Sequence, residues 1–207
     1  MLGIHNFALF LATGVLLNLT PGPDTAFILG RSIAHGRRSG IASALGIGVG
    51  SLIHTSAAAL GLSAFLATTA WAFTGLKFAG GAYLIFLGVQ MIWQRRQKVV
   101  SVESARSTPR GAFRQGIFTN VLNPKVALFF LAFLPQFIDP AAPGKIIAFI
   151  VLGLTFVTTG TLWCITLALF AATIATRMRR NEAIADWLNR GIGSLFVFLG
   201  TRLALSR

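Results

Sequence analysis

Two short polar motifs carry the residues of this chain that could bind a charged solute. The first spans 18–25 and reads NLTPGPDT, and the second spans 119–125 and reads TNVLNPK. Asp24 supplies a carboxylate in the first motif, and Lys125 supplies an ammonium in the second. Ionisable groups at membrane depth cost at least about 2.5–3.5 kcal/mol and mark functional sites. The two side chains together complement a zwitterion, which carries one ammonium and one carboxylate.

Each motif interrupts an apolar run that would otherwise cross a membrane as one helix. The interruptions contain Pro21, Gly22 and Pro23 in the first run and Pro124 in the second. Proline removes a backbone donor and clashes with the preceding turn, so both helices should break there. Irregular backbone at membrane depth is tolerated where it lines a cavity, and paired broken helices point to a transporter's substrate site. The pattern therefore predicts a solute transporter.

Each charged residue has two interpretations. Asp24 follows the prolines where a new half-helix should start, so its carboxylate could cap that helix terminus. Alternatively, it faces the cavity, where it receives a substrate ammonium or carries a coupling proton. Lys125 also begins a half-helix, where the helix dipole disfavours a cation. It therefore needs a partner, which is either Asp24 or a substrate carboxylate.

Neutral polar residues surround the two breaks. Asn18, Thr20, Asn120 and Asn123 could contact the substrate or satisfy the backbone groups that the prolines free. His54 lies within a later apolar run, where it could belong to a proton path. A hydrogen-bonded structural histidine explains it equally well.

Composition places the chain in a membrane. Of the 207 residues, 55% are hydrophobic and 11% are charged, with a mean hydropathy of +0.74, whereas about a quarter of the residues in globular proteins are charged. The formal charge of +13 resides mainly in links between apolar runs, as in cytoplasmic loops of membrane proteins. Nucleic-acid binding is therefore not favoured. The single Cys164 excludes an internal disulfide.

The apolar runs predict an all-α fold with about six transmembrane helices. They lie at about 5–29, 40–66, 73–93, 115–137, 145–172 and 187–204. The basic links, at 31–38, 94–114 and 176–186, should be cytoplasmic, which places both termini on the other side. Residues 94–114 are expected to form a mobile loop.

The two halves of the chain look like repeats. Gly14 matches Gly116 and Asn18 matches Asn120 at one offset. Chance matches between common residues are the alternative. Three spans in each repeat, 1–93 and 115–207, would make the second repeat inverted relative to the first. Inverted repeats place the binding site near the midplane, between the halves.

The two motifs, together with the GAYL sequence at 81–84 and Leu87-Gly88, resemble the lysine-exporter and homoserine/threonine-exporter (LysE/RhtB) family. The resemblance covers essentially the whole chain. It implies a six-helix exporter of amino acids or close derivatives in the bacterial inner membrane, driven by the proton gradient. Matching motif positions imply the functional set Asn18, Pro21, Gly22, Pro23, Asp24, Asn120, Asn123, Pro124 and Lys125.

Other functions fit the residues less well. A divalent-cation exporter would need several acidic, Cys or His ligands, and the chain offers essentially Asp24 and His54 near the midplane. Ser51 lies one turn before His54, but a hydrolase would need a third orienting group. We therefore expect no enzyme, metal site or cofactor. The expected partners are a zwitterionic amino acid, protons and lipid, and the sequence leaves a homodimer open.

Overall fold

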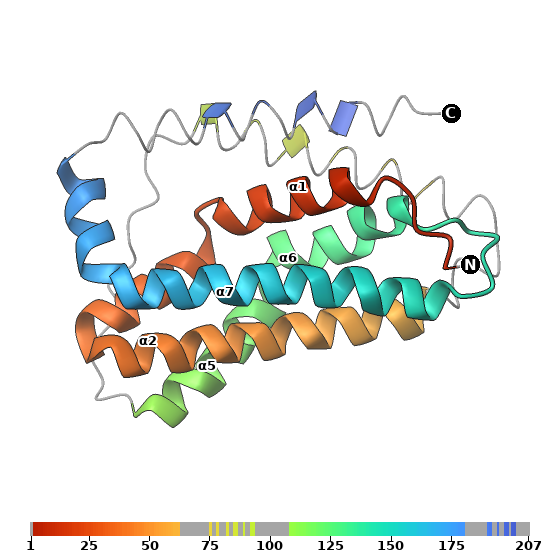
Figure 1. Ribbon diagram of the computed structural model, residues 1–207. Helices are drawn as coiled ribbons and strands as arrows, with labels where there is room; N and C mark the ends of the chain where they lie inside the picture. The colour runs from red at the N-terminus through yellow and green to blue at the C-terminus, as the bar shows by residue number, and fades with distance from the viewer. Residues whose placement is uncertain are drawn as a thin grey trace.

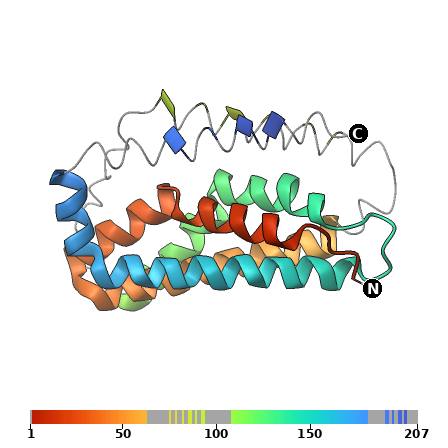
Figure 2. The same ribbon diagram turned by 45° about the horizontal axis from the view of Figure 1, so that its top comes forward.

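The computed structural model describes residues 2–62 and 108–180. It also describes the isolated residues 75, 78, 82, 85, 86, 89, 92, 93, 190, 191, 194, 197, 198, 200 and 201. Every regular element in these residues is helical (Figure 1). The third and sixth expected spans lie largely outside the described residues. Their described residues are helical and lie on the same side of the bundle, beyond α1 (Figures 1 and 2).

The first break separates α1 (Phe7–Leu19) from α2 (Pro23–Ala57). Thr20 leaves the helical conformation and ends α1, and Pro23 starts α2 at a position where its missing N–H costs nothing. The break therefore lies where the sequence predicted it.

Helix α2 contains a sharp turn at Gly36, whose φ is 80° and ψ is 172°. Glycine occupies this left-handed region without the clash that a Cβ would cause. The chain changes direction there and runs back along the bundle (Figure 1). The basic link expected at 31–38 is therefore helical apart from this glycine. Arg31, which the sequence placed in this basic link, lies in α2 with its side chain buried.

The second break separates α5 (Pro109–Val121) from α6 (Pro124–Leu128), and the two helical segments meet at 48°. The π-helix η2 (Phe129–Phe133) and the 3₁₀ helix η3 (Leu134–Phe137) continue α6. Helix α5 begins earlier than the expected span, because Thr108 caps its N-terminus by accepting a hydrogen bond from the Gly111 N–H at 3.2 Å. Residues 109–114 of the expected loop are thus helical.

Several helices are long and apolar enough to cross a membrane. In the described residues, two helices qualify: Pro23–Gly61, which takes in most of the π-helix η1 (Ala58–Leu62), and Lys145–Ala171. The bent pair Pro109–Val121 plus Pro124–Phe137 adds a third candidate. Helix α7 (Lys145–Arg180) contains the second of these. The side chains of Leu60 and Leu122 are exposed, so part of the outer surface of the bundle is apolar, as expected of a surface that faces lipid.

Small residues let the helices approach closely. A Cβ on Gly46 would lie 2.0 Å from the Phe113 carbonyl oxygen, so α2 and α5 touch through their backbones there. Gly48 similarly lies against Thr161 of α7. These glycines serve helix packing, as expected of small residues in membrane bundles. An aromatic core that includes Phe129, Phe130 and Phe156 fills the space between α1, η2 and α7.

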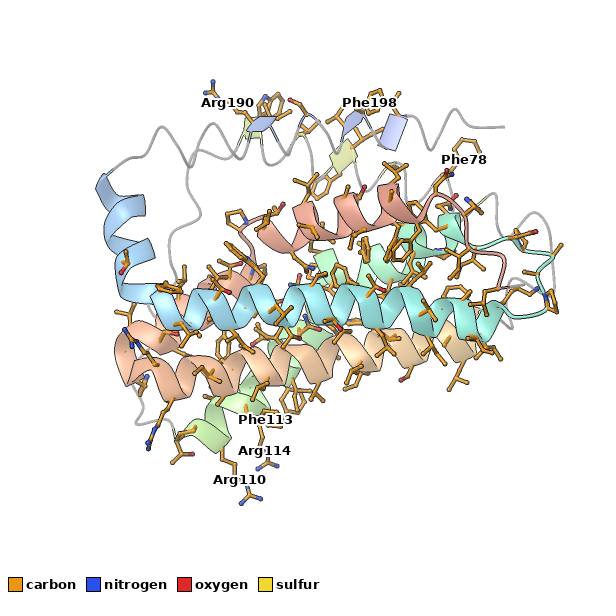
Figure 3. The ribbon with its side chains drawn as sticks, in the orientation of Figure 1. Phe78, Arg110, Phe113, Arg114, Arg190 and Phe198 are labelled. Carbon is orange, nitrogen blue, oxygen red and sulfur yellow. The ribbon has the colours of Figure 1, made fainter. Side chains whose placement is uncertain are left out.

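The two ends of the bundle differ in charge. At one end, the Gly3 carbonyl accepts a hydrogen bond from Asp139 N–H at 2.8 Å, which ties the start of the chain to the turn before α7. The turn in α2 lies at the opposite end (Figure 1). We call this the basic end, because it carries exposed Arg37, Arg38, Arg110 and Arg114. Arg110 and Arg114 point away from the helices (Figure 3).

Candidate functional site

A small cavity lies between the two breaks. Its volume is about 30 Å³, which is room for roughly two or three waters. Helices α1, α2, α5, α6 and α7 all contribute to its wall. The lining residues are Asn18, Asp24, Thr25, Ile47, Gly48, Ser51, Asn120, Lys125, Val126, Phe156, Gly160, Thr161 and Cys164. The structure thus brings together both charged residues and two of the asparagines that the sequence singled out.

Asp24 lies in the first turn of α2, where the positive end of the helix dipole favours a carboxylate. Its Oδ2 accepts a hydrogen bond from the Asn120 side-chain amide across the site at 2.8 Å. Its Oδ1 is buried and has no hydrogen-bond partner among the described residues. The second break therefore holds one carboxylate oxygen through Asn120, and the Asn123 side chain also lies close to the carboxylate.

Lys125 lies in the first turn of α6, where the helix dipole disfavours a cation, and its ammonium has partners that the sequence did not reveal. Its Nζ donates to the carbonyl oxygens of Leu17 at 3.1 Å and Thr20 at 2.9 Å, at the C-terminus of α1. The dipole of α1 favours a cation there. Asp24 and Lys125 are both described, and no salt bridge joins them. An ammonium has three donors, so one remains for the cavity.

Gly22 leaves space for the Lys125 side chain because it has no Cβ. A Cβ on Gly22 would lie 3.2 Å from the Lys125 Nζ and 3.6 Å from its Cε. A larger residue in this position of the first break would therefore press against the ammonium that caps α1. The backbone of Gly22 is extended, so the requirement is one of space rather than conformation.

Asn120 connects three groups of the site and is 1% exposed. Besides donating to Asp24, its side-chain oxygen accepts a hydrogen bond from the Ser51 hydroxyl at 3.2 Å. Its backbone oxygen lies 3.2 Å from His54 Nε2. Asn120 thus links the Asp24 carboxylate at the start of α2 to Ser51 and His54 in a later part of the same helix.

The remaining predicted residues have mainly structural contacts. Asn123 caps α6 through its Oδ1, which accepts from the Lys125 N–H at 3.0 Å. Its buried Nδ2 has no partner within the described part of the chain. Thr20 donates its hydroxyl to the Leu16 carbonyl at 2.7 Å. Asn18 donates to Thr159 of α7 at 3.2 Å and also lines the cavity.

His54 lies beside the cavity rather than in its wall. Its ring stacks on Phe130 with a centroid distance of 5.7 Å and an interplanar angle of 19°. Asn120 joins His54 to Asp24, with the histidine at its backbone and the carboxylate at its side chain. The histidine is therefore hydrogen-bonded, and its place in a proton path remains a prediction.

Sequence reasoning missed several lining residues. Ser51 was considered only as a nucleophile, although a hydroxyl one turn from His54 could have been assigned to the same site. Thr161, Gly160 and Cys164 come from α7, which carries no proline or charge at this level. Without such a signal, only the fold could place them at the cavity.

Broken helices that enclose a polar cavity within an apolar bundle define a membrane transport protein. The chain belongs to the LysE type translocator family, whose defining pattern matches residues 15–207. The expected family resemblance is thereby confirmed.

Relatives from other bacteria resemble the chain over nearly their whole length. A homoserine/homoserine lactone efflux protein of Salmonella typhimurium is 35% identical, with 96% of this chain and 95% of the relative covered. A leucine efflux protein of Klebsiella pneumoniae is 30% identical, with 98% and 96% covered. An uncharacterized membrane protein of Pseudomonas aeruginosa is 32% identical, with 98% and 96% covered. No solved structure matches the chain.

Proposed function

We propose that this chain exports amino acids or close derivatives across the bacterial inner membrane. The observation that carries this proposal is the cavity between the two breaks, which is lined by the Asp24 carboxylate and the Lys125 ammonium. Relatives that are efflux proteins for homoserine and its lactone, or for leucine, support the same substrate class.

In this proposal, the substrate ammonium binds the open Oδ1 of Asp24, and the substrate carboxylate binds the remaining N–H of Lys125. Leaving either charge of a zwitterion unpaired in a dry site would cost several kcal/mol. The proposed binding set also includes four neutral residues, which either line the cavity or contact one of the two charged residues: Asn18, Thr20, Asn120 and Asn123. The cavity is smaller than an amino acid, so in this proposal it widens when substrate binds.

The proposed architecture has six spans in two inverted repeats, 1–93 and 115–207. The segment 94–114 between them, whose residues 109–114 begin α5, would lie on the cytoplasmic side. The basic end would face the cytoplasm, because the cytoplasmic loops of membrane proteins carry an excess of Lys and Arg. The location of residues 2–5 and 138–144 together, away from that end, supports this orientation. Both termini would then lie outside the cytoplasm. The proposal is compatible with a monomer and with a homodimer.

Coupling to protons would make the protein an antiporter. Asp24 or His54 would carry the proton, and their connection through Asn120 supports either choice. A carboxylate that binds a proton and a substrate ammonium in turn couples the two by competition.

Export of a divalent metal, the alternative function, is not favoured. Among the described residues, no group of three or more His, Cys, Asp or Glu side chains lies close enough to hold an ion. Metal export sites need several such ligands.

Amino-acid profiling tests the proposal directly. Cells with and without the gene are loaded with dipeptides, and their intracellular amino acids are measured. An amino acid that accumulates only without the gene identifies the substrate and the direction. Its efflux from preloaded cells should slow when a protonophore collapses the gradient at constant ATP. Efflux that follows ATP instead would rule out the antiport.

Cysteine labelling tests the topology. Impermeant reagents should reach positions in 31–38, 94–114 and 176–186 from the cytoplasm only, and positions in 139–144 from the other side only. Labelling of 94–114 and 139–144 from one side would contradict the inverted arrangement.

A further inference from the structure

Arg31 is a buried cation that the central site does not use. It is 5% exposed in α2, on the basic side of the cavity. One terminal nitrogen of its guanidinium donates to the side-chain oxygen of Gln115 on α5, and its Cζ lies 5.4 Å from the centre of the Phe27 ring. Its Nε and Nη1 are buried without a hydrogen-bond partner in the described part of the chain.

The two acidic side chains that the structure describes do not neutralise Arg31. Asp24 bonds to Asn120, and Asp139 bonds to the Ala141 N–H in the turn before α7. A buried charge whose partner is missing destabilises a protein strongly. The planar guanidinium presents its donors in a fork that matches an oxyanion such as a carboxylate or a phosphate. The open donors of Arg31 therefore match such a group in charge and geometry.

The position of Arg31 relates this site to the central cavity. Arg31 lies about two helical turns after Asp24 on the same face of α2, which is roughly 10 Å along the helix axis. Both side chains contact α5, Asp24 through Asn120 and Arg31 through Gln115. Phe27 lies between them in the sequence and packs beneath the guanidinium. Arg31 therefore lies along α2 between the turn at the basic end and the cavity.

We propose that Arg31 and Gln115 form an entry site that binds the carboxylate of the transported amino acid before it passes Phe27 and reaches the cavity. This inference rests on the proposed function. A lipid phosphate offers the same oxyanion chemistry, but the burial of Arg31 beneath α5 favours the small solute.

The test measures transport separately from each face of the membrane, with radiolabelled leucine and homoserine as probes. Inverted and right-side-out membrane vesicles are prepared from cells that produce the native chain, Arg31→Gln or Arg37→Gln. Arg37 is exposed at the same end and serves as the charge-matched control. Arg31→Gln should raise the half-saturation concentration roughly tenfold or more on the face that exposes Arg37, because hydrogen bonds to a charged group are lost. The other face and the Arg37→Gln protein should match the native chain.

A substrate analogue tests whether the carboxylate is the recognised group. Leucinamide keeps the ammonium of leucine and lacks the carboxylate. The native chain should prefer leucine to leucinamide as a competitor on the basic face, and Arg31→Gln should reduce that preference by a similar factor. In proteoliposomes, this change should be the same with and without anionic lipid. An effect that needs anionic lipid would assign the site to a lipid phosphate and overturn the proposal.

The Gln115→Glu variant distinguishes substrate binding by Arg31 from a purely structural role of Arg31. It also tests the entry site if the Arg31→Gln protein does not fold. The new carboxylate would neutralise Arg31 permanently, which should raise the melting temperature and also raise the half-saturation concentration on the basic face. Gln136→Glu, the same change near the other end, is the control. A stabilised Gln115→Glu protein with unchanged half-saturation would overturn the entry site. Absence of transport by the native chain would instead refute the proposed function itself, and the entry site with it.

Discussion

The two helix breaks are alike in the helices that precede them and differ in the helices that follow them. Asn18 before the first break lies against Gly160 of α7, and Asn120 before the second lies against Gly50 of α2. In each case a Cβ on the glycine would come within 2.9 Å of the asparagine. Beyond this point the breaks diverge, because α2 starts with a carboxylate and α6 starts with an ammonium.

The charges at the two breaks are held in different ways. Asp24 suits the dipole of its own helix and receives one hydrogen bond from the second break. Lys125 does not suit its own helix and instead caps α1 across the site. The comparison indicates that Lys125 has a structural role as well as a proposed binding role, whereas the Asp24 carboxylate is freer to act on the substrate.

The largest predicted effect distinguishes the two charges directly. Asp24→Asn keeps an oxygen for the Asn120 amide but removes the charge, so export should fall by a hundredfold or more, since roughly 3–5 kcal/mol of pairing is lost. Abundance and melting temperature should stay near those of the native chain. Efflux assays at matched expression measure the loss, with the exposed Asp139→Asn as control. Normal export by Asp24→Asn would leave the carboxylate with only a structural role.

Lys125→Met should lose export to a similar degree and also lower stability. Its removal leaves the Leu17 and Thr20 carbonyls without the ammonium, at a cost of about 1–3 kcal/mol. Thermal unfolding in detergent measures this loss. Lys145→Met, which removes a bond to the Pro140 carbonyl near the other end, is the control for export. The Asp24→Asn/Lys125→Met double variant should insert at least as well as Lys125→Met and still not export.

The matched asparagines should give a smaller, unequal pair of effects. Asn120→Ala removes contacts to Asp24 and Ser51, so transport should fall by roughly tenfold or more. Asn18→Ala removes one bond to Thr159, whose hydroxyl also donates to backbone carbonyls of α7, so a change of only a few-fold is expected. Equal losses in an efflux assay would mean that the two breaks act symmetrically.

The glycines beneath the asparagines should separate packing from transport. Gly50→Ala and Gly160→Ala each force a Cβ into the facing asparagine, so each should destabilise the fold by about 1–3 kcal/mol. Gly50→Ala should impair transport more, because it displaces the residue that holds Asp24. Gly61→Ala, where a Cβ meets nothing within 4 Å, is the control. A larger transport loss in Gly160→Ala would reverse the proposed asymmetry.

The smallest effect should come from Ser51→Ala. This change removes one neutral hydrogen bond to Asn120, worth about 0.5–1.5 kcal/mol. Transport should fall only a few-fold, since Asn120 still donates to Asp24. Comparison with Ser56→Ala, an exposed serine on the same helix that bonds only to its own backbone, checks the change.

The sequence predicted the breaks well because prolines act on the backbone locally. It also placed Asp24, Lys125, Asn18 and Asn120 at a shared site. It missed the partner of Lys125, because carbonyl oxygens of another helix leave no trace in side-chain patterns. It also placed Arg31 in a basic link between two apolar runs, because charge normally marks a loop. The left-handed Gly36 compresses that link into a turn, and tertiary packing then covers the arginine.

Cys164 gives the native chain a built-in reporter. It is the one cysteine in the sequence, it is buried and free, and it lies in the cavity wall. In the proposed transport cycle, a thiol reagent in water should reach it faster when the cavity widens. The labelling rate of the unmodified protein would then report on cavity opening, without an engineered probe or a known substrate. Any compound that occupies the cavity should change that rate, so a library of solutes can be screened by mass spectrometry alone.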